Sequence, residues 1–507
     1  MIRNQIQLKT IDQGGLIFNF LETGDIYDIT YQDAQINLIH GNLVDGGYFN
    51  VYLRIFKEGQ ILFTPLIGKH SPSTCQIISN QAIYEGSFED ISYRINLMIQ
   101  GFRFDLMIQL KSQTPQVVDV MFGSDLAITS KGSVLNSEPY TVQYIDYKVF
   151  QDGNGYTLCA RQNQGRSQYF QMGSFQKTKG YTTDGFQFFG LQAKETGIPD
   201  AMSVDRLISE IYQYEFAYFA LQSEKLLIDN HGVKQTFYGV YEPQEHDVIK
   251  KPKEVYPLLM TPESLQCNQT NYQHGLLNPR NRLNGRHLTE EEWQLLYPYR
   301  DQEERLDGEI LSFFTHRHHH VVAKKKELLV ERQHGHLLVH GDLEHVSDHV
   351  MATTNWMFGV FHSHVVLGNS SFNKLLGDLR NPLNLQTISG IRIYVKRHGK
   401  YQLLGLPSYY DMGGATTRWV YMIDNHRIQI DTYVHPDHLQ QGLHYQSDDP
   451  SIEDVVLVQQ VLMNVNEHLS HIPYTISEGM ITYYPPKGSM MDMKYPSLKY
   501  RYQFDQP

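Results

Sequence analysis

The sequence predicts a mainly β protein built from two large antiparallel β-sandwich domains joined by a short helical linker. Three observations support this fold class. Aromatic residues are abundant, with 34 Tyr and 24 Phe among 507 residues, and many recur with Ile, Val and Leu at every second position. That alternation is typical of strands with one buried face. Signals for helices are few, and residues 243–308 interrupt the strand pattern.

The first half of the chain contains clear strand patterns. Apolar residues alternate through residues 93–110, and Gly101 is placed where a turn or bulge would divide the run. Residues 211–222 alternate again, and Asp229-Asn230-His231-Gly232 predicts a hairpin turn into a strand at Phe237-Tyr238. Asp152-Gly153-Asn154-Gly155 is a second hairpin turn rather than an anion-binding loop.

The middle of the chain has the clearest helix signals. Thr289 is a good N-cap because Glu290, Glu291 and Glu292 follow it in the first turn, where carboxylates suit the helix dipole. Ser203 predicts a short helical turn through Ile208. We expect a first domain over residues 1–242, a linker over residues 243–308 and a second domain over residues 309–507.

The second half returns to the strand pattern. Frequent turns between many short strands are typical of sandwiches. The predicted strands are Ile310–Phe314, Val321–Val322, Leu328–Val330, Leu337–Val339, 391–395, 401–406, 418–423, 427–434 and Met480–Tyr484.

Bulk composition excludes several classes of protein. The net charge is −12, and the sequence shows no basic face of the kind that nucleic-acid binding needs. The cluster Lys324-Lys325-Lys326 is best explained as a solvated turn. Three scattered cysteines favour a reducing compartment over a disulfide framework. Residues 1–13 lack a signal-peptide pattern, and no apolar run approaches the roughly 20 residues of a membrane helix. We therefore expect a cytoplasmic protein without a membrane partner.

The 24 histidines raise the question of a metal site. His316, His318, His319 and His320 form one cluster, but neither a cysteine pair nor a His-Glu-x-x-His helix accompanies it, so a polar hairpin tip is the better interpretation. In an extended segment, His318 and His320 would share a face.

A second group of histidines has alternating spacing. His362-Ser363-His364 would place both imidazoles on one side of a strand, and His334-Gly335-His336 has the same spacing. His364 is a candidate acid for mutarotase-type chemistry. Histidines that line a sandwich face or an interface are the simpler explanation.

Carboxylates and cations show no catalytic pattern. A glycosidase needs two carboxylates about 5 to 10 Å apart, and the sequence singles out no pair, although Asp184, Glu195 and Glu215 are candidates. Phosphorolysis needs one acid and donors that hold phosphate. Arg161, Arg166 and Arg380 lie near polar loops, but no phosphate cradle adjoins them.

Sugar binding remains open, because aromatic rings stack on sugar rings while amide and guanidinium groups bind hydroxyls. The aromatic residues with polar neighbours are Trp356, Trp419, Tyr409 and Tyr410, and those neighbours include Asn355, Asn369 and Arg418. Packing in the core or at its rim is the default role for each ring.

Several stretches together resemble a known family. They are 136–150, 180–190, 212–218, 331–336, 358–364 and 380–384. In these residues the chain resembles the N-terminal region of the 1,2-β-oligoglucan phosphorylases, which are relatives of cellobiose phosphorylase and cyclic β-1,2-glucan synthase. The resemblance spans nearly the whole chain.

This resemblance implies sandwiches of the galactose-mutarotase-like super-sandwich type, followed in family members by an (α/α)₆ barrel that carries the catalytic acid and most of the phosphate site. The family reaction converts a β-1,2-glucan and inorganic phosphate into α-glucose 1-phosphate and a shortened glucan. We expect this chain to end before such a barrel, so no catalytic, cofactor-binding or metal-binding residue is assigned. Sugar or interface contacts are expected at Arg161, Trp356, His362, His364, Arg380 and Asn381.

The expected partners are a β-glucan oligosaccharide, a barrel domain or chain, and a second copy in a homodimer, with phosphate as the co-substrate of the complete enzyme. The leading hypothesis is a non-catalytic portion of a phosphorylase. The alternatives are a self-sufficient carbohydrate epimerase or hydrolase that uses a sandwich face, and an inactive gene fragment.

Overall fold

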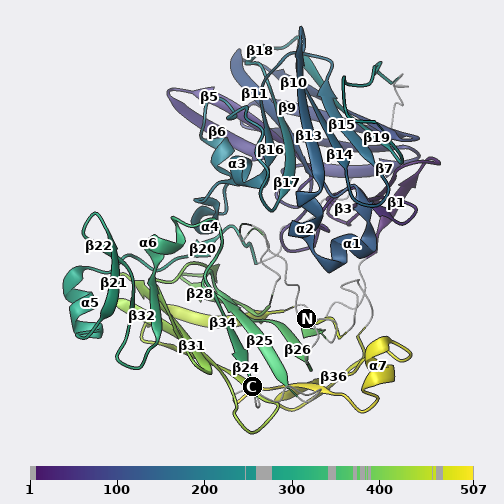
Figure 1. Cartoon of the computed structure of the whole chain (residues 1–507). Coiled ribbons are helices and arrows are strands. Elements are labelled where there is room, and N and C mark those ends of the chain that lie inside the picture. The colour runs from purple at the N-terminus through teal and green to yellow at the C-terminus, as the bar shows by residue number, and fades with distance from the viewer. Residues whose placement is uncertain are drawn as a thin grey trace. The chain divides into compact units, whose positions relative to one another are not determined.

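The computed structural model describes residues 7–245, 247–258, 277–340, 350–368, 374–376, 383, 385, 390–459, 461–463 and 472–505. The chain divides into two compact units. Among the described residues, the first unit holds 7–190 and 198–258, and the second holds 191–197 and the residues from 277 onward. Both units are built from sheets in which nearly all strand pairs are antiparallel, which confirms the predicted fold class (Figure 1).

Two large sheets form the first unit. The eight-stranded sheet contains, in spatial order, β13 (Ile145–Asp152), β14 (Gly155–Gln162), β15 (Tyr169–Ser174), β19 (Val233–Glu242), β10 (Arg103–Ser112), β9 (Ile91–Gln100), β8 (Gln81–Phe88) and β7 (Thr74–Ile78). The six-stranded sheet contains β16 (Thr178–Asp184), β17 (Ala217–Ser223), β11 (Gln116–Asp125), β5 (Asn50–Lys57) and β6 (Gln60–Pro65), with β18 (Leu226–Ile228) beside β11.

Aromatic rings join these two sheets into a sandwich. Phe122 of β11 packs 6.2 Å from Phe104 of β10 and 5.6 Å from Phe237 of β19, measured between ring centroids. Phe49, just before β5, contacts both Phe104 and Phe122. The contacts among Phe49, Phe104 and Phe122 are edge-to-face, a geometry that adds to the stabilisation from apolar burial. The core of the first unit therefore lies between the sheets.

Smaller elements complete the first unit. A five-stranded sheet contains β1 (Lys9–Asp12), β2 (Ile17–Phe20), β3 (Ile26–Tyr31), β4 (Ala34–Gln35) and β12 (Thr129–Ser130). The helices are α1 (Lys131–Asn136), α2 (Glu138–Gln143), α3 (Gly185–Phe189) and the 3₁₀ turn η1 (Asp200–Met202).

Within its described residues, the second unit contains four sheets. Seven strands form the largest: β21 (Asp301–Leu306), β22 (Glu309–Phe314), β23 (His320–Ala323), β30 (Tyr409–Gly413), β31 (Thr416–Ile423), β32 (His426–Val434) and β33 (Gln441–Ser447). The others are β20 (Arg282–Leu283), β29 (Lys400–Leu404), β28 (Arg392–Arg397) and β34 (Ile452–Val458); β24 (Gly335–Val339), β25 (Met351–Trp356), β26 (Val360–Leu367) and β27 (Lys374–Leu376); and β35 (Tyr474–Ser477), β36 (Met480–Tyr483) and β37 (Tyr500–Gln503).

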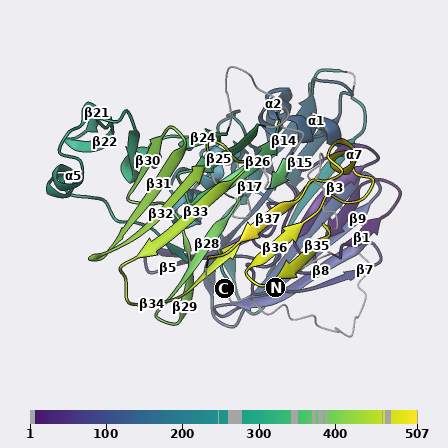
Figure 2. The same cartoon turned by 90° about the horizontal axis from the view of Figure 1, so that it is seen from below.

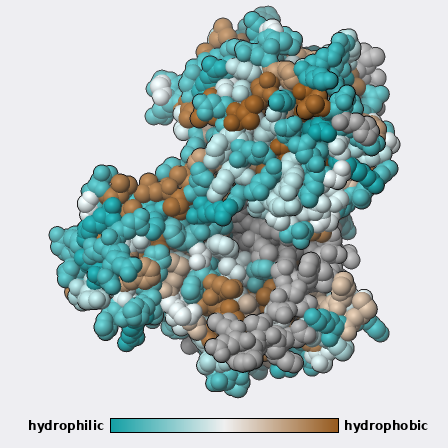
Figure 3. Space-filling view, in the orientation of Figure 1, coloured by the Kyte–Doolittle hydropathy of each residue, from teal (hydrophilic) through white to brown (hydrophobic). Residues whose placement is uncertain are grey.

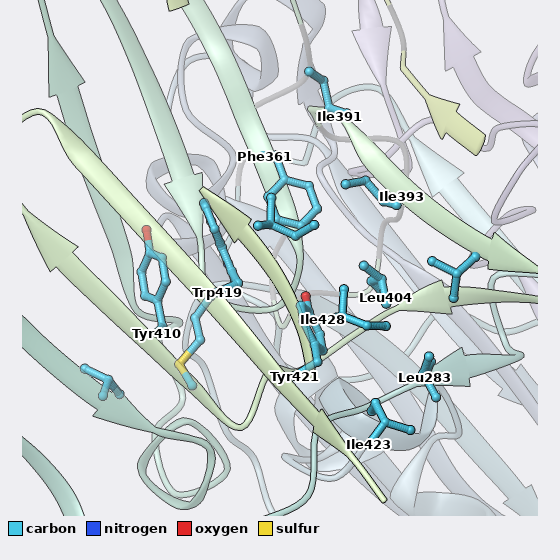
Figure 4. Close-up of a cluster of buried hydrophobic side chains, with 14 of the residues drawn as sticks. Leu283, Phe361, Ile391, Ile393, Leu404, Tyr410, Trp419, Tyr421, Ile423 and Ile428 are labelled. Atoms are coloured by element: carbon cyan, nitrogen blue, oxygen red, sulfur yellow. The ribbon is translucent and has the colours of Figure 1, made fainter. Parts of the chain in front are cut away.

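The main core of the second unit lies on one face of the seven-stranded sheet. Trp419 and Tyr421 of β31 are fully buried there and lie in one cluster with Phe361 of β26 and Ile393 of β28 (Figure 4). The opposite face is partly covered by α5 (Glu290–Leu296), whose Trp293 packs on Tyr409 and Phe313. One face thus contributes to the core, and the other face is only partly covered.

The short helix α4 (Ala193–Thr196) belongs to the second unit, although the residues on both sides of it belong to the first. The Arg282 guanidinium donates to the carbonyls of Ala193, at 3.1 Å, and Lys194, at 2.6 Å. Asn284 donates to the carbonyl of Glu195 at 3.0 Å. The carbonyls of Lys194 and Glu195 are ones that the C-terminus of α4 leaves without helical partners, whereas that of Ala193 also accepts from the N–H of Gly197.

The predicted hairpins are confirmed. Residues 93–110 form β9 and β10, joined at Gly101, which has φ of +57°. The turns at 152–155 and 229–232 precede β14 and β19 as expected. Thr289 caps α5 through a capping box in which Thr289 and Glu292 satisfy each other's backbone N–H groups.

Other predictions are wrong. Residues 211–216 are not a strand, because the N–H groups of Tyr212 and Tyr214 donate to side chains of Thr183 and Asp184 instead of a strand partner. The helical turn predicted from Ser203 to Ile208 is absent; η1 ends at Met202, and the buried Arg54 binds carbonyls of Ala201 and Val204.

Two further segments of the second unit differ from the prediction. Lys324–Glu327 form a helical turn, α6, and Leu328–Val330 do not form a strand. Residues 277–308 were expected in the linker, but β20 pairs with β29 and β21 is an edge strand of the seven-stranded sheet. Buried Leu283 and Trp293 explain why this segment packs with the second unit.

Candidate functional site

Arg161 lies on β14, and its guanidinium is hydrogen-bonded to loops of the first unit. Its guanidinium donates to the carbonyl of Glu245 at 3.1 Å, to Asn163 at 2.6 Å and to Ser167 at 3.3 Å. Arg166 pairs with Asp33 at 3.1 Å on the surface. These contacts assign Arg161 a bracing role within its own unit.

The aromatic residues named from the sequence are mostly core residues. Trp419 and Tyr410 are fully buried, and Tyr409 is buried against α5. Trp356 is half-buried, covers Gly335, and packs beside Phe358 and Val360. None of these four rings is an open platform for a sugar.

His362 is the centre of a buried polar network in the second unit. Its Nε2 lies 2.9 Å from the carbonyl oxygen of Gly442, and its backbone N–H donates to Asn355 at 2.7 Å. Asn355 in turn donates to Thr417 and Thr432 on the seven-stranded sheet. Burial lowers the pKa of His362 to about 4, against a weaker opposing effect of the bond to Gly442. The imidazole is therefore neutral and ties β26 to the facing sheet.

His364 lies two residues further along β26. Both histidines have positive φ, +46° for His362 and +51° for His364, and the register with β25 shifts twice across this stretch. Bulges of this kind re-aim side chains, so the simple alternation expected for a regular strand is interrupted here. Arg380, Asn381 and Asn369 lie outside the described residues.

The three carboxylates named from the sequence have local partners. Asp184 is fully buried and caps α3, accepting from the N–H of Phe186 and Tyr214, each at 2.8 Å. Glu195 forms an ion pair with Lys324. Glu215 is half-buried in the segment before β17. Asp184 thus has a capping role and Glu195 an ion-pairing role.

A buried group that sequence reasoning missed surrounds Glu327, at the end of α6. Glu327 Oε2 lies 2.6 Å from His334 Nδ1 and also accepts from the His334 N–H at 3.0 Å. Lys194 Nζ lies 3.8 Å from Glu327 Oε1 and donates to the carbonyl of Glu327 at 2.9 Å and to that of Val330. Burial is the largest influence on Lys194 and lowers its pKa. No sequence signal links Lys194 to residues 133 positions away.

His319, from the predicted histidine cluster, lies beside Asp411. Its Nδ1 is 2.9 Å from Asp411 Oδ1, and the hydroxyl of Tyr297 donates to Asp411 Oδ2 at 3.1 Å. Residues 316–319 form a turn, and His320 begins β23, so the extended segment that would place His318 and His320 on one face is absent. Within the described residues, no group of three or more His, Cys, Asp or Glu side chains could hold a metal ion.

These arrangements permit limited chemistry. His319 and His334 are each oriented by a carboxylate, which is how proteins fix the tautomer of an imidazole that binds ligands or transfers protons. Within the described residues, the carboxylates named above do not form a solvent-accessible pair that could face a glycosidic bond. No helix in that same part is long and apolar enough to cross a membrane.

Comparison with known families matches both units. Residues 19–239 match the model described as the SOGP N-terminal domain. Residues 297–507 match the model described as the glycoside phosphorylase supersandwich domain. The two matches fall mainly within the first and second units, respectively.

A curated relative matches nearly the whole chain. A 1,2-beta-oligoglucan phosphorylase from Listeria innocua serovar 6a is 30% identical over 501 residues, which are 97% of this chain and 45% of that protein. The chain thus spans slightly less than half of the length of the curated relative it matches.

Similar solved structures are distant. A GalM/aldose epimerase homologue from C. elegans is 8% identical and covers 48% of this chain and 100% of its own, with a TM-score of 0.30. A bacterial glucoamylase complexed with acarbose is 11% identical and covers 48% of this chain and 34% of its own, with a TM-score of 0.29. Both likenesses are too distant to assign a property to this chain.

Proposed function

Because the chain carries the SOGP N-terminal domain and the glycoside phosphorylase supersandwich domain, we propose that it is the non-catalytic portion of a β-1,2-glucan phosphorylase. In this role it docks a catalytic (α/α)₆ barrel and contacts a β-glucan oligosaccharide in the cytoplasm. The complete assembly would use inorganic phosphate as co-substrate and release α-glucose 1-phosphate.

One observation carries the proposal. The similarity to the Listeria innocua phosphorylase extends over 97% of this chain but only 45% of that relative. If the two proteins share one activity, more than half of the polypeptide that performs it lies outside the matched region. We accordingly propose that the catalytic acid and the phosphate site belong to a further domain or chain.

The side chains of the described region support this division. An inverting phosphorolysis needs an acid that faces the glycosidic oxygen and cations that face phosphate. Asp184, Glu195 and Glu327 instead bond to groups of their own unit. Arg161 is likewise occupied by loops of the first unit.

Exposed apolar side chains favour a partner. Ile208 and Ile211 of the first unit are more than half exposed, and Leu295 of the second unit is 83% exposed. The face drawn in Figure 3 shows hydrophobic patches separated by hydrophilic surface. Such patches are common where another domain or subunit docks.

Complementation tests the proposal. The part of the Listeria innocua protein outside the matched region is expressed as a separate chain and mixed with this chain, sophorose-series glucans and phosphate. We expect α-glucose 1-phosphate only when both chains are present. Failure to co-purify together with failure to gain activity would contradict the proposal.

A self-sufficient epimerase or hydrolase is the second candidate, favoured by the carboxylate-oriented imidazole of His319. Turnover by the purified chain alone distinguishes it, measured by polarimetry of fresh aldose solutions and by glucose release from glucans. Activity without a partner chain that His319→Ala abolishes would favour this candidate over the first.

A further inference from the structure

The outer face of β30 to β33 is the side of the seven-stranded sheet opposite the core cluster of Figure 4. These strands run side by side (Figure 2). Asp411 pairs in register with Arg418, Arg418 with Asp431, and Asp431 with His444. Residues directly opposite each other share one face, so these four side chains form a row of polar groups across four strands.

Hydrogen bonds hold this row in place. Arg418 Nε donates to Asp431 Oδ1 at 2.6 Å, and Gln429 Nε2 donates to Asp431 Oδ2 at 2.6 Å. Asp411 is fixed by Tyr297 and by His319. The Arg418 side chain is 47% exposed, and its Nη1 and Nη2 atoms have no hydrogen-bond partner among the described residues. A pre-positioned guanidinium of this kind offers donors to a ligand at little entropic cost.

Two rings lie on the same face, each over a glycine. A Cβ built on Gly413 would lie 2.3 Å from His319 Nε2, and one built on Gly442 would lie 2.2 Å from the Tyr433 ring. Glycine at these two positions is what allows each ring to rest on the backbone. Tyr433 is 39% exposed, and the His319 side chain is 31% exposed.

The two rings lie over β30 and β33, at opposite ends of this four-stranded part of the sheet. Gly413, Thr416, Tyr433 and Gly442 follow one another in register across the four strands. Three strand spacings place the two glycines about 14 Å apart. A single sugar ring is too short to cover both rings, whereas a short oligosaccharide reaches from one to the other over Arg418 and Asp431.

We infer that this outer face, defined by His319, Asp411, Arg418, Asp431 and Tyr433, is a binding surface for a neutral oligosaccharide. Stacking on flat rings and bidentate bonds from planar groups suit a ligand rich in hydroxyls. Alternating negative and positive charges suit a neutral chain and disfavour a polyanion. The inference rests on the proposed function only for the choice of a β-glucan as ligand.

Affinity electrophoresis of the full chain tests the inference, with soluble β-1,2-glucan in the native gel and isothermal titration against its oligosaccharides. We expect retarded migration of the natural chain and about fivefold weaker binding by Tyr433→Ala, since a ring contact contributes about 1 kcal/mol. Arg418→Gln should also weaken binding. The matched control is Phe504→Ala, which removes an exposed ring of the same unit next to β37, a strand of another sheet.

Three outcomes would overturn the inference: no binding of the glucan, equal affinity of Tyr433→Ala and the natural chain, or a preference for sulfated polysaccharide. Thermal unfolding of each variant establishes that it is folded. Because complementation with the catalytic chain is measured separately, retained glucan binding without complementation would contradict the proposed function alone.

Discussion

At the scale of single residues, His362 shows how burial fixes a protonation state. Its imidazole is enclosed between β26 and the seven-stranded sheet and donates to the carbonyl of Gly442. A buried imidazolium would lack the hydration that stabilises its charge. The network therefore requires the neutral ring.

We predict that His362 makes the second unit less stable in mild acid. Burial lowers its pKa from 6.5 to about 4, so the unfolded chain binds the proton first as pH falls below 6.5. The folded state therefore keeps its full stability above pH 6.5 and loses stability as the pH falls towards 4. At pH 5 this loss in the free energy of unfolding amounts to about 2 kcal/mol. His362→Gln keeps a donor for Gly442 but cannot be protonated.

Guanidinium unfolding of both proteins at pH 7 and pH 5 measures the effect. The natural chain should lose about 2 kcal/mol more than His362→Gln between the two values. His398→Gln is the matched control, because His398 also has positive φ, +51°, but lies exposed in a turn. An equal loss in the natural chain and in His362→Gln would refute this role.

The sequence predicts single residues well when their role is local. Thr289 was recognisable as a cap because its partner Glu292 is three residues away. Lys194 and Glu327 were not, since neither has a local pattern and only the fold brings them together. The double bulge at His362 and His364 was also invisible, because alternation of residue types carries no information on positive φ.

At the scale of elements, α4 is held more firmly than its length suggests. Its carbonyls bond to Arg282 and Asn284, and its Lys194 donates to carbonyls at the end of α6. A helix this short is unstable in isolation. Tertiary contacts, not helix propensity, therefore keep it folded.

We predict that Lys194→Met destabilises the second unit by about 3 kcal/mol, because it leaves the buried Glu327 carboxylate and two carbonyls without their cationic partner. All three tryptophans, Trp293, Trp356 and Trp419, lie in this unit, so their fluorescence follows its unfolding. The exposed Lys148→Met of the first unit is the control. An unchanged fluorescence midpoint in Lys194→Met would refute the prediction.

Hairpins were the elements that could be predicted best from the sequence. Glycine turns and alternation fix β9 and β10 because their partners adjoin in the chain. Residues 211–216 have the same alternation but bond to side chains of Thr183 and Asp184, which no periodicity reveals. Strand order within the large sheets likewise depends on contacts between distant segments.

At the scale of the whole molecule, each unit encloses its own core and contains side chains whose chemical or fluorescence signals report on the folding of that unit. Cys75 and Cys159 both belong to the first unit, while the tryptophans belong to the second. Burial is the main cause that raises the pKa of each thiol to about 12. The reactive thiolate is therefore scarce at neutral pH.

We predict that neither thiol reacts with Ellman's reagent at pH 8 while the first unit is folded. The experiment uses a Cys267→Ser background, since Cys267 lies outside the described residues. Reaction should begin only at denaturant concentrations that unfold the first unit. Rapid labelling of the native chain would show that these thiols are accessible.

The placement of α4 has a consequence for protein synthesis. Lys194 leaves the ribosome 133 residues before Glu327 does, a delay of roughly 7 to 27 seconds at ordinary elongation rates. During that interval the first sandwich, including β17 and β19, can fold. The heptapeptide 191–197 stays exposed to solvent until its binding site in the second unit has been synthesised. A gene fragment that starts at residue 275 would lack this heptapeptide, so its product would need the missing peptide supplied in trans.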